Sequence, residues 1–519
     1  MASIRSASKI AVLLPFALLL AICAIRILAL DDFPLIDPSE GRYAEISREM
    51  AETNDYLVPH FEAGEPFWGK PPMYFWAASL SIELFGATEF AVRLPSTIFN
   101  LLTVLVVFLL ALKAGAGKSA AYLTAIILLT SGLFYSLSGL ALTDTAISFF
   151  TTLALATFYL SYRAEERYIR LLCSAILPLA LASAILSKGL IAFMIVLPPI
   201  LSFALIQPSL RERLKCAFYI GAQLLVAIAV SVPWHIMADR RSPGFLDYYL
   251  IGEHFNRFFQ PGWKSLYGTA HSEAYGMIWV FLAIGFLPWT LVLLWQAYIN
   301  RRSFSKVSFL RPEFAFVLTW ALALPLAFSF TRGVMFPYVL PVMPAWALLC
   351  GHLLSRLEAG PASQWRIAPV WQRMSLVVPL AFFVASHFIL PIVGMKRSQE
   401  FLSDTVRFLD TDKDARIVYL GSMPYSADFY SGGRAVNEPS VSHGSILSYL
   451  RNHGQEYFVI VPQDEISLKD FVRHGKLELV YRSPKQALFR EPDLKDVPVH
   501  DFIATLPWSL RFINYIYNS

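Results

Sequence analysis

Apolar blocks of roughly 20 residues recur along this chain, separated by short basic loops. A helix of about 20 residues crosses the hydrocarbon core of a bilayer, and lipid offers no partner to an exposed backbone N–H or C=O group. The blocks are therefore predicted to be spanning helices, because the strands of a membrane barrel would alternate apolar and polar residues. Hydrophobic residues make up 56% of the chain and charged residues 16%, against about a quarter charged in soluble domains, which argues against a water-soluble fold.

The hydropathy pattern predicts a polytopic α-helical membrane protein with about eleven spans, and up to thirteen. The predicted spans are residues 10–30, 95–113, 119–138, 142–162, 170–187, 189–207, 215–237, 275–299, 313–330, 334–355 and 374–394. The first block is interpreted as a retained helix, since it is long for a signal peptide and lacks a clear small-residue cleavage site. Lysine and arginine cluster in alternate loops, which the positive-inside rule assigns to the cytoplasm.

This orientation predicts two domains. Residues 1–394 form the membrane domain, with outer loops at 31–94 and 238–274, and residues 395–519 form a small extracytoplasmic α/β domain. In that second domain, helix-like segments at 400–409, 445–453 and 467–474 alternate with strand-like segments at 416–420, 457–461 and 477–481. All four cysteines fall inside apolar blocks, so no disulfide is expected. The net charge of +5 comes from basic residues in alternate loops, which is explained by membrane orientation and does not indicate nucleic-acid binding.

The first outer loop carries two candidate catalytic carboxylates, Asp37 and Glu40. From Pro38 onward the sequence has helical periodicity, and we expect an amphipathic helix that lies on the membrane surface. A structural alternative exists, in which Asp37 at the N-cap, Pro38 at N1 and Glu40 at N3 form a capping box without any catalytic role.

Lys70 stands directly before two prolines in an aromatic-rich segment of the same loop, which leads into a second amphipathic helix ending near Phe85. The prolines stiffen the backbone, so the Lys70 ammonium is expected at the height of the lipid headgroups, where phosphates lie. Alternatively, Lys70 has no binding role: its methylene groups lie in the apolar region and its ammonium reaches toward water.

Several cations occur on the side of the membrane that the positive-inside rule leaves poor in them. They are Lys188, Arg240, Arg241, Arg257, Lys264 and Arg332. Such residues do not orient the chain, and together they indicate a site for an anion such as a phosphate or diphosphate. Each could also be an ordinary surface residue.

Three further polar residues lie at predicted outer span ends or in an outer loop. Asp144 begins a span whose continuation is apolar, where a carboxylate caps its helix, forms an ion pair or acts in catalysis. His235 and His254 are candidate ligands for a divalent metal together with Asp37 or Glu40. No ligand spacing supports this metal site, and no other cofactor is indicated.

The order of these motifs resembles that of the bacterial GT-C glycosyltransferases. The motifs are Asp37-Pro38 with Glu40-Gly41-Arg42-Tyr43, Lys70-Pro71-Pro72, Arg93-Leu94-Pro95-Ser96, Thr143-Asp144, Ser187-Lys188-Gly189, Pro233-Trp234-His235, Glu253-His254-Phe255 with Arg257, and Thr331-Arg332-Gly333 with Tyr338. The resemblance covers roughly residues 10–350. It is greatest to the lipid A aminoarabinose transferases and related members of the protein O-mannosyltransferase superfamily.

The resemblance implies a GT-C fold and inverting transfer of a sugar from a polyprenyl-phosphate donor at the periplasmic face of the bacterial inner membrane. It places an acidic group of the first loop, Asp37 or Glu40, at the reacting centre, Lys70 on the donor phosphate and Asp144 at the acidic position of the fourth span. The full set of predicted substrate-binding residues is Arg42, Tyr43, Lys70, Arg240, Arg241, His254, Arg257, Arg332 and Tyr338.

The expected partners are the lipid-linked donor, the bilayer and a glycolipid acceptor such as lipid A, with the protein acting as a monomer. Two alternatives stay open, namely sugar transfer to proteins and a flippase or transporter for lipid-linked sugars. A flippase would be favoured by charges midway along spans, whereas this chain keeps nearly all of its charges at the span ends.

Overall fold

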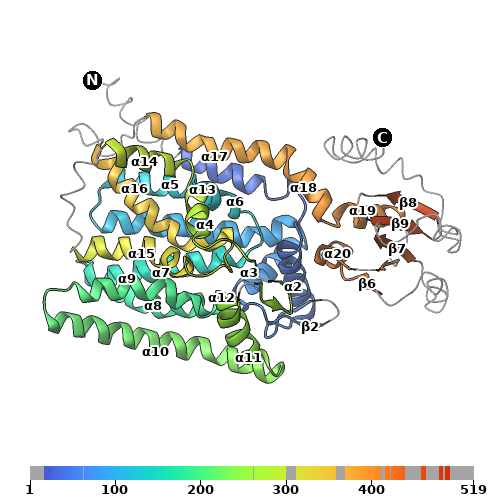
Figure 1. The fold of residues 1–519 in the computed structure, drawn as a ribbon, viewed down its shortest axis with the longest axis horizontal. Coiled ribbons are helices and arrows are strands. Elements are labelled where there is room, and N and C mark those ends of the chain that lie inside the picture. The colour runs from blue at the N-terminus through green and yellow to red at the C-terminus, as the bar shows by residue number, and fades with distance from the viewer. Residues whose placement is uncertain are drawn as a thin grey trace.

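The computed structural model describes residues 17–61, 64–260, 262–269, 271–299, 311–357, 369–410, 415–420, 422–438, 457–462, 478–482 and 486–490. A large helical bundle is joined to a smaller domain that contains a β-sheet, at the right of Figure 1. The helices predicted at 445–453 and 467–474 lie outside the described residues, as does the start of the first predicted span.

Every predicted span is helical over most of its described length. The bundle helices are Ala17–Leu28, α4 (Glu89–Lys113), α5 (Lys118–Leu129), α6 (Gly132–Leu137), α7 (Thr143–Arg163), α8 (Arg167–Lys188), α9 (Ile191–Leu205), α10 (Leu210–Arg241), α13 (Met277–Gly285), α14 (Trp289–Ile299), α15 (Pro312–Phe328), η3 (Phe336–Val342), α16 (Met343–Leu357), α17 (Pro369–Phe388) and α18 (Leu390–Arg397). Among the described residues, five stretches are long and apolar enough to cross a membrane, or six when the bent pair α13–α14 counts as one. The five are α4, α7, α8, α10 and η3 with α16.

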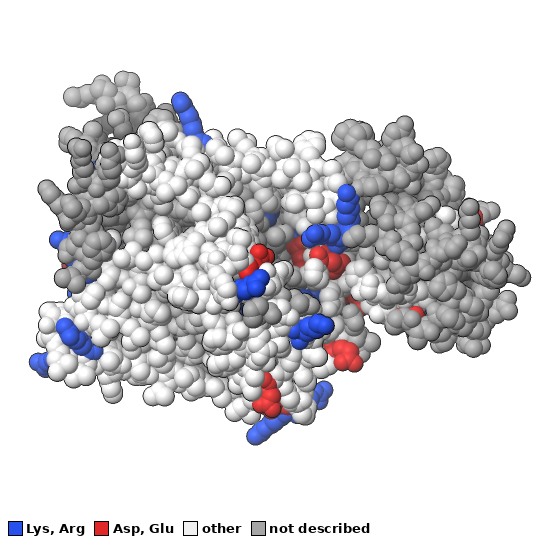
Figure 2. Space-filling view, viewed as in Figure 1, with Lys and Arg blue, Asp and Glu red and all other residues white. Residues whose placement is uncertain are grey.

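The surface of the bundle fits a lipid environment. Phe218 and Leu225 of α10 are 81% and 70% exposed, which would be unfavourable in water and suits contact with acyl chains. On the face in Figure 2, uncharged side chains cover the middle of the bundle, while charged side chains gather at its left edge and around the loops beside the C-terminal domain. The chain is a multi-pass membrane protein. The total of eleven spans stays a prediction.

Local sequence explains where several helices begin and end. The Thr88 side chain accepts a hydrogen bond from Ala91 N at the start of α4, and the Ser209 side chain accepts one from Glu212 N at the start of α10. Pro312 occupies the first turn of α15, where no backbone N–H is needed. Helix α8 ends at Gly189, whose φ of +69° is readily adopted only by glycine.

Two predicted spans are not continuous helices. The span predicted at 119–138 divides into α5 and α6, and the one predicted at 275–299 divides into α13 and α14, which meet at an angle of 99°. Pro288 lies in the second break and has no N–H to continue the helical hydrogen bonds. At the start of α6, directly after the first break, Gly132 N donates to Leu287 O of the second break, so the two interruptions are bonded to each other.

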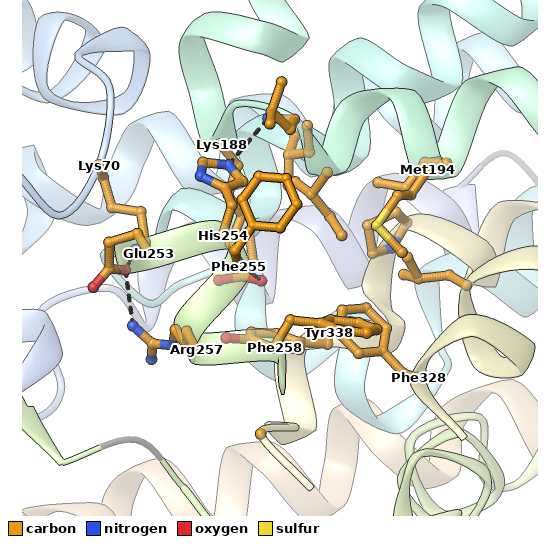
Figure 3. A pocket seen from close by; sticks show the side chains of 18 of the residues that line it. Lys70, Lys188, Met194, Glu253, His254, Phe255, Arg257, Phe258, Phe328 and Tyr338 are labelled. Carbon is orange, nitrogen blue, oxygen red and sulfur yellow. Dashed lines mark hydrogen bonds and ion pairs between the residues drawn. The ribbon is translucent and has the colours of Figure 1, made fainter. Parts of the chain in front are cut away.

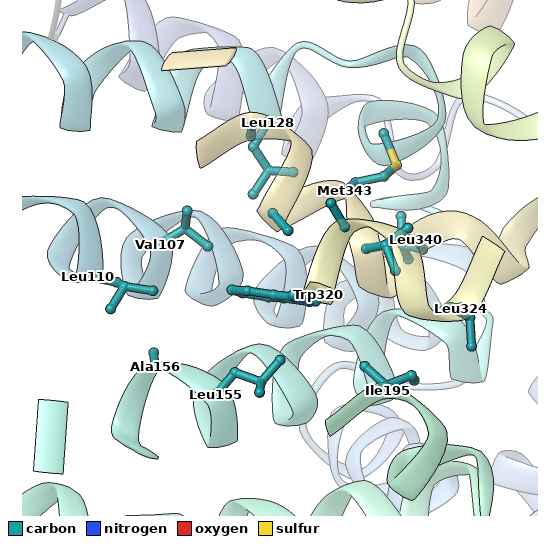
Figure 4. Packing of buried hydrophobic residues seen from close by; sticks show 14 of the residues in the cluster. Val107, Leu110, Leu128, Leu155, Ala156, Ile195, Trp320, Leu324, Leu340 and Met343 are labelled. Carbon is teal, nitrogen blue, oxygen red and sulfur yellow. The ribbon is translucent and has the colours of Figure 1, made fainter. Parts of the chain in front are cut away.

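The core of the bundle is apolar and tightly packed. Trp320 of α15 is fully buried in the apolar cluster that also contains Leu110 of α4 and Leu155 of α7 (Figure 4), and its indole N–H donates to Pro341 O at 3.0 Å. Trp289 is also fully buried and donates to Thr130 Oγ1 at 3.1 Å. Each buried indole N–H therefore has the partner that it needs in an apolar surrounding.

Helices α5 and α16 touch at Gly351, and this contact gives a test of the packing. A Cβ atom added at Gly351 would overlap Thr124 Oγ1 and lie 2.8 Å from Thr124 N. We expect Gly351→Ala to lower the free energy of unfolding by about 1–3 kcal/mol, the usual cost of overpacking. Thermal unfolding of the detergent-purified protein measures this.

Gly221 in α10 is the matched control, because a Cβ atom there meets nothing within 4 Å. Gly221→Ala is expected to stabilise the protein slightly, by at most about 1 kcal/mol, since alanine favours the helix over glycine. Equal effects of the two substitutions would contradict the close contact between α5 and α16.

The loops that join the spans carry short elements of their own. They are α2 (Ser39–Thr53), β1 (His60–Phe61), β2 (Glu65–Pro66), α3 (Met73–Phe85), α11 (Phe245–Asp247), the π-helix η1 (Tyr248–Asn256), α12 (Arg257–Phe259), β3 (Lys264–Ser265) and β4 (Gly268–Thr269). The two helical segments predicted in the first loop are confirmed as α2 and α3, but α2 is not an open surface helix, since Glu45 and Arg48 on its predicted polar side are buried. The packing of α2 against α3 buries Tyr43, Phe75 and Ala78 in a second apolar cluster.

The C-terminal domain contains a mixed five-stranded sheet in the order β6-β5-β7-β9-β8. Its elements are α19 (Glu400–Leu409), β5 (Arg416–Tyr419), α20 (Tyr425–Ser431), β6 (Ala435–Asn437), β7 (Tyr457–Pro462), β8 (Glu478–Arg482) and β9 (Gln486–Arg490). The helix predicted at 400–409 and the three predicted strands are confirmed, whereas α20, β6 and β9 were not predicted. Helix α20 lies against α2 of the first loop (Figure 1), which brings the sheet domain to the functional site.

Candidate active site

A cavity of about 330 Å³ lies where the loop elements meet the end of the bundle. Its lining is divided chemically, as Figure 3 shows, with Lys70, Glu253 and Arg257 on one side and Met194 and Phe328 on the other. The remaining apolar lining comes mainly from α9, α12 and α15. The cavity therefore combines a charged end with a hydrocarbon-like wall.

The charged end is built around Glu253 of η1. Its carboxylate accepts from Lys70 Nζ at 2.9 Å and from Arg257 at 2.9 Å. Burial raises the pKa of Glu253, but the charges of Lys70 and Arg257 outweigh this and hold it at about 2. Glu253 is therefore ionised at neutral pH and serves to position two cations. Burial in turn lowers the pKa of Lys70, and Glu253 opposes that effect.

A second ion pair joins Lys188 at the end of α8 to Asp144 at the start of α7, with 2.5 Å between Nζ and Oδ1. The Lys188 ammonium also lies 4.6 Å from the ring centroid of Tyr338, in cation–π geometry. Asp144 makes no side-chain cap of its helix, so the capping alternative is wrong. With Lys70, Glu253 and Arg257, this pair gives the cavity three cations and two carboxylates, which leaves one net positive charge.

The two predicted histidine ligands do not form a metal site in the described part of the chain. His254 lines the cavity, but its Nε2 accepts from Leu190 N at 3.1 Å and its Nδ1 is bonded to Tyr249 O at 2.8 Å. His235 is bonded to Ser231 O. Among the described residues no group of three or more His, Cys, Asp or Glu side chains is arranged to hold a metal.

Asp37 lies outside the cavity lining, beside α20 of the C-terminal domain. Its carboxylate accepts from the Ser426 hydroxyl and, at 3.1 Å, from Ser426 N. Helix α2 begins at Ser39 after Pro38, without a side-chain cap, so the predicted capping role of Asp37 is wrong. Burial raises the pKa of Asp37 to about 6, although the hydrogen bonds from Ser426 lower it.

Glu40 is fixed by structural contacts. Its carboxylate accepts from Arg93 at 2.8 and 3.0 Å, from Ala141 N and from Ile36 N. Arg93 is fully buried and also donates to three backbone carbonyl groups, Leu30 O, Phe33 O and Pro34 O. This pair holds the first loop onto α4, so of the two candidate catalytic carboxylates only Asp37 is without an ion pair in the described structure.

Arg42 and Tyr43 connect these two regions. The Arg42 guanidinium is buried among the rings of Phe67, Tyr267 and Tyr425, and its Nε has no partner among the described residues. Burial raises the pKa of the Tyr43 hydroxyl. The cations Arg42 and Lys188 lower this pKa, and the carboxylate of Asp144 raises it. Helix α2 therefore lies beside the charged end of the cavity.

Four of the six predicted outer cations, Arg240, Arg241, Lys264 and Arg332, do not line the cavity. Arg240 and Arg241 are exposed at the end of α10, and Arg332 donates from Nε to Glu273 O at 2.9 Å. The structure instead brings together Lys70, Lys188 and Arg257, with His254 and Tyr338 nearby.

Two residues of this arrangement were not predicted. Glu253 stands four residues before Arg257, a spacing that pairs opposite charges on a helix, so the sequence did contain a signal for it. Ser426 lies 389 residues from Asp37, and no local pattern connects the two.

Fold and site together define a multi-pass membrane protein with an amphipathic, cationic cavity beside its loop helices. Residues 10–249 match the dolichyl-phosphate-mannose-protein mannosyltransferase family. The matched region is a little less than half of the chain, and it lies within the part whose motifs resemble those of the GT-C membrane glycosyltransferases.

Two arabinosyl transferases are similar in sequence to a large part of this chain. The undecaprenyl phosphate-alpha-4-amino-4-deoxy-L-arabinose arabinosyl transferase of Aeromonas hydrophila is 30% identical over 345 residues, 66% of this chain and 60% of the relative. Its counterpart in Yersinia enterocolitica is 32% identical over 319 residues, covering 61% of this chain and 54% of the relative. The matches thus span about 60% of the length of the first relative.

The fold matches the crystal structure of ArnT from Cupriavidus metallidurans bound to undecaprenyl phosphate. The TM-score is 0.75 at 19% identity, and the match covers 93% of this chain and 99% of that one. At this identity the likeness establishes the fold alone.

Proposed function

We propose that this protein transfers a sugar from a polyprenyl-phosphate donor to an acceptor at the periplasmic face of a bacterial inner membrane, with inversion. The observation that carries the proposal is the composition of the cavity lining, with three cations and two carboxylates against an otherwise mostly apolar wall. A lipid-linked phosphate has the same division, an anionic head and a hydrocarbon tail. In this topology of about eleven spans, the loops with α2, α3 and η1, and the domain of residues 395–519, face the periplasm.

The chain's own residues account for stabilisation of the leaving group. As the bond from sugar to phosphate breaks, negative charge grows on the lipid phosphate, and cations already fixed in a partly dry cavity stabilise it. Glu253 holds Lys70 and Arg257 for this role, and Asp144 holds Lys188. Phe258, Phe328 and the apolar residues of α9 take the first part of the prenyl chain.

Asp37 is the acceptor-side carboxylate in this proposal. With its pKa near 6 it is ionised at neutral pH and can accept a proton from an acceptor hydroxyl, or orient a phosphate acceptor, which needs no deprotonation. We infer that the donor carries 4-amino-4-deoxy-L-arabinose, because the names of the relatives specify that sugar on undecaprenyl phosphate. Lipid A is the proposed acceptor because the motifs resemble those of the lipid A aminoarabinose transferases. Protein acceptors, named by the matching family, are the alternative.

The proposed function predicts a change in the envelope. Lipid A from cells that carry the gene should contain the amino sugar, and lipid A from cells without it should not, as measured by mass spectrometry. Glycosylated proteins with unchanged lipid A would favour the protein acceptor, and an unchanged envelope would contradict the proposal.

A pH dependence follows from Asp37. Since the carboxylate acts in its ionised form and its pKa is about 6, the transfer rate should fall as pH drops through 6. Asp37→Asn should be slow at every pH and lack this acid limb. If the rate of Asp37→Asn still falls as pH drops through 6, another group causes the pH dependence.

A further inference from the structure

The C-terminal domain reaches Asp37 through α20. Ser426 is fully buried, its hydroxyl and backbone N–H bind the two oxygens of the Asp37 carboxylate separately, and both contacts come from one residue of the sheet domain. Two donors at two oxygens fix both the position of a carboxylate and its rotation.

The Ser426 hydroxyl is itself oriented. It accepts a hydrogen bond from Gln399 N at 3.0 Å, so its own hydrogen is directed toward Asp37. The Gln399 side chain accepts from Tyr419 of the sheet, and Asp37 N donates to Arg397 O. The segment from α18 to α19 and the sheet therefore hold Ser426 against the first loop.

The approach of the two domains is close. A Cβ atom at Gly41 would clash with Asp37 Oδ1 and lie 2.9 Å from Ser426 N, so only glycine leaves room for the contact. One helical turn further, Tyr430 of α20 accepts from Leu35 N at 2.8 Å and donates to Glu89 at 2.6 Å. These contacts anchor α20 on both sides of Asp37.

We propose that Ser426 is a positioning residue for Asp37, so that the C-terminal domain supplies part of the active site. This inference rests on the proposed function. Without the hydroxyl, the Asp37 carboxylate keeps only the hydrogen bond from the backbone N–H of residue 426. One hydrogen bond does not fix the rotation of the carboxylate. The charged and titratable groups that otherwise face Asp37 are Glu40 and Arg42 of α2 and Tyr419 of β5.

The test compares Ser426→Ala with Ser426→Thr, which keeps a hydroxyl, and with Ser403→Ala. Ser403 is buried in α19 and its hydroxyl has no partner among the described residues, so its removal is the matched control. Full-length protein in lipid nanodiscs is given undecaprenyl-phosphate-linked 4-amino-4-deoxy-L-arabinose and lipid A. The readouts are kcat against pH and the affinity for undecaprenyl phosphate.

Ser426→Ala should lower kcat by roughly 10- to 100-fold, the cost of a misplaced reacting group. Its acid limb should move to higher pH, because a hydrogen bond to the charged carboxylate lowers the pKa and is now lost. Undecaprenyl phosphate should bind as before, Ser426→Thr should restore much of the rate, and Ser426→Ala should add nothing to Asp37→Asn.

Two kinds of failure are distinguishable. If the unmodified protein transfers the sugar, but Ser426→Ala does so at the same rate with the same acid limb, the positioning role is overturned and the proposed function stands. If the unmodified protein transfers no sugar, the proposed function is overturned and this role with it.

Discussion

Replacing Lys70 with methionine is expected to lower kcat/KM for sugar transfer by roughly 10²- to 10³-fold, as for the loss of one preorganised charge donor. Methionine keeps the length of the side chain, and Glu253 stays paired with Arg257, so the fold should persist. The cavity would fall from one net positive charge to none and lose a cation at the leaving phosphate. Transfer assays and binding of undecaprenyl phosphate measure both effects.

Lys264 provides the matched control for this prediction. It is an exposed cation in β3, is one of the six predicted outer cations, and does not line the cavity. Lys264→Met should therefore leave transfer unchanged. Full activity in Lys70→Met would count against the cavity as the donor site, whereas equal losses in both variants would indicate a diffuse electrostatic effect.

The second large effect concerns stability. Removing Arg93 should destabilise the protein by about 3–5 kcal/mol, because Glu40 would be left as a buried charge without its partner and three backbone carbonyl groups would lose their donor. Arg93→Met keeps much of the side-chain volume and isolates the electrostatic part. The midpoint of thermal unfolding in detergent measures the change.

A double-mutant cycle with Glu40→Met sharpens this test. If the pair is a buried salt bridge, the double variant should be less destabilised than the sum of the two single variants, since it leaves neither charge unpaired. Additive effects would contradict direct coupling. Gly221→Ala, which is expected to stabilise the protein slightly, serves again as the reference, because Gly221 lies in α10 and a Cβ atom there meets no neighbour.

Much of the fold could be predicted from the sequence because the signals are local. Apolar blocks gave the bundle helices, and the periodicity after Pro38 and Lys70 gave α2 and α3. The breaks at α5–α6 and α13–α14 were missed, since the apolar pattern continues across them while the backbone does not. Among the elements of the described C-terminal domain, the short α20 and β6 have too few residues to show a period.

The candidate site, like the fold, was predicted from the sequence only in part. The sequence by itself determined that cations lie at predicted outer span ends and that carboxylates stand in the first loop, because those residue types are costly in lipid and carry their own signal. Only the tertiary structure decided their partners, with Lys70 and Arg257 on Glu253, Glu40 on Arg93 and Asp37 on Ser426. The physical reason is that hydrophobicity and helical period act between neighbours in the chain, whereas an ion pair depends on which helix ends packing brings within about 4 Å.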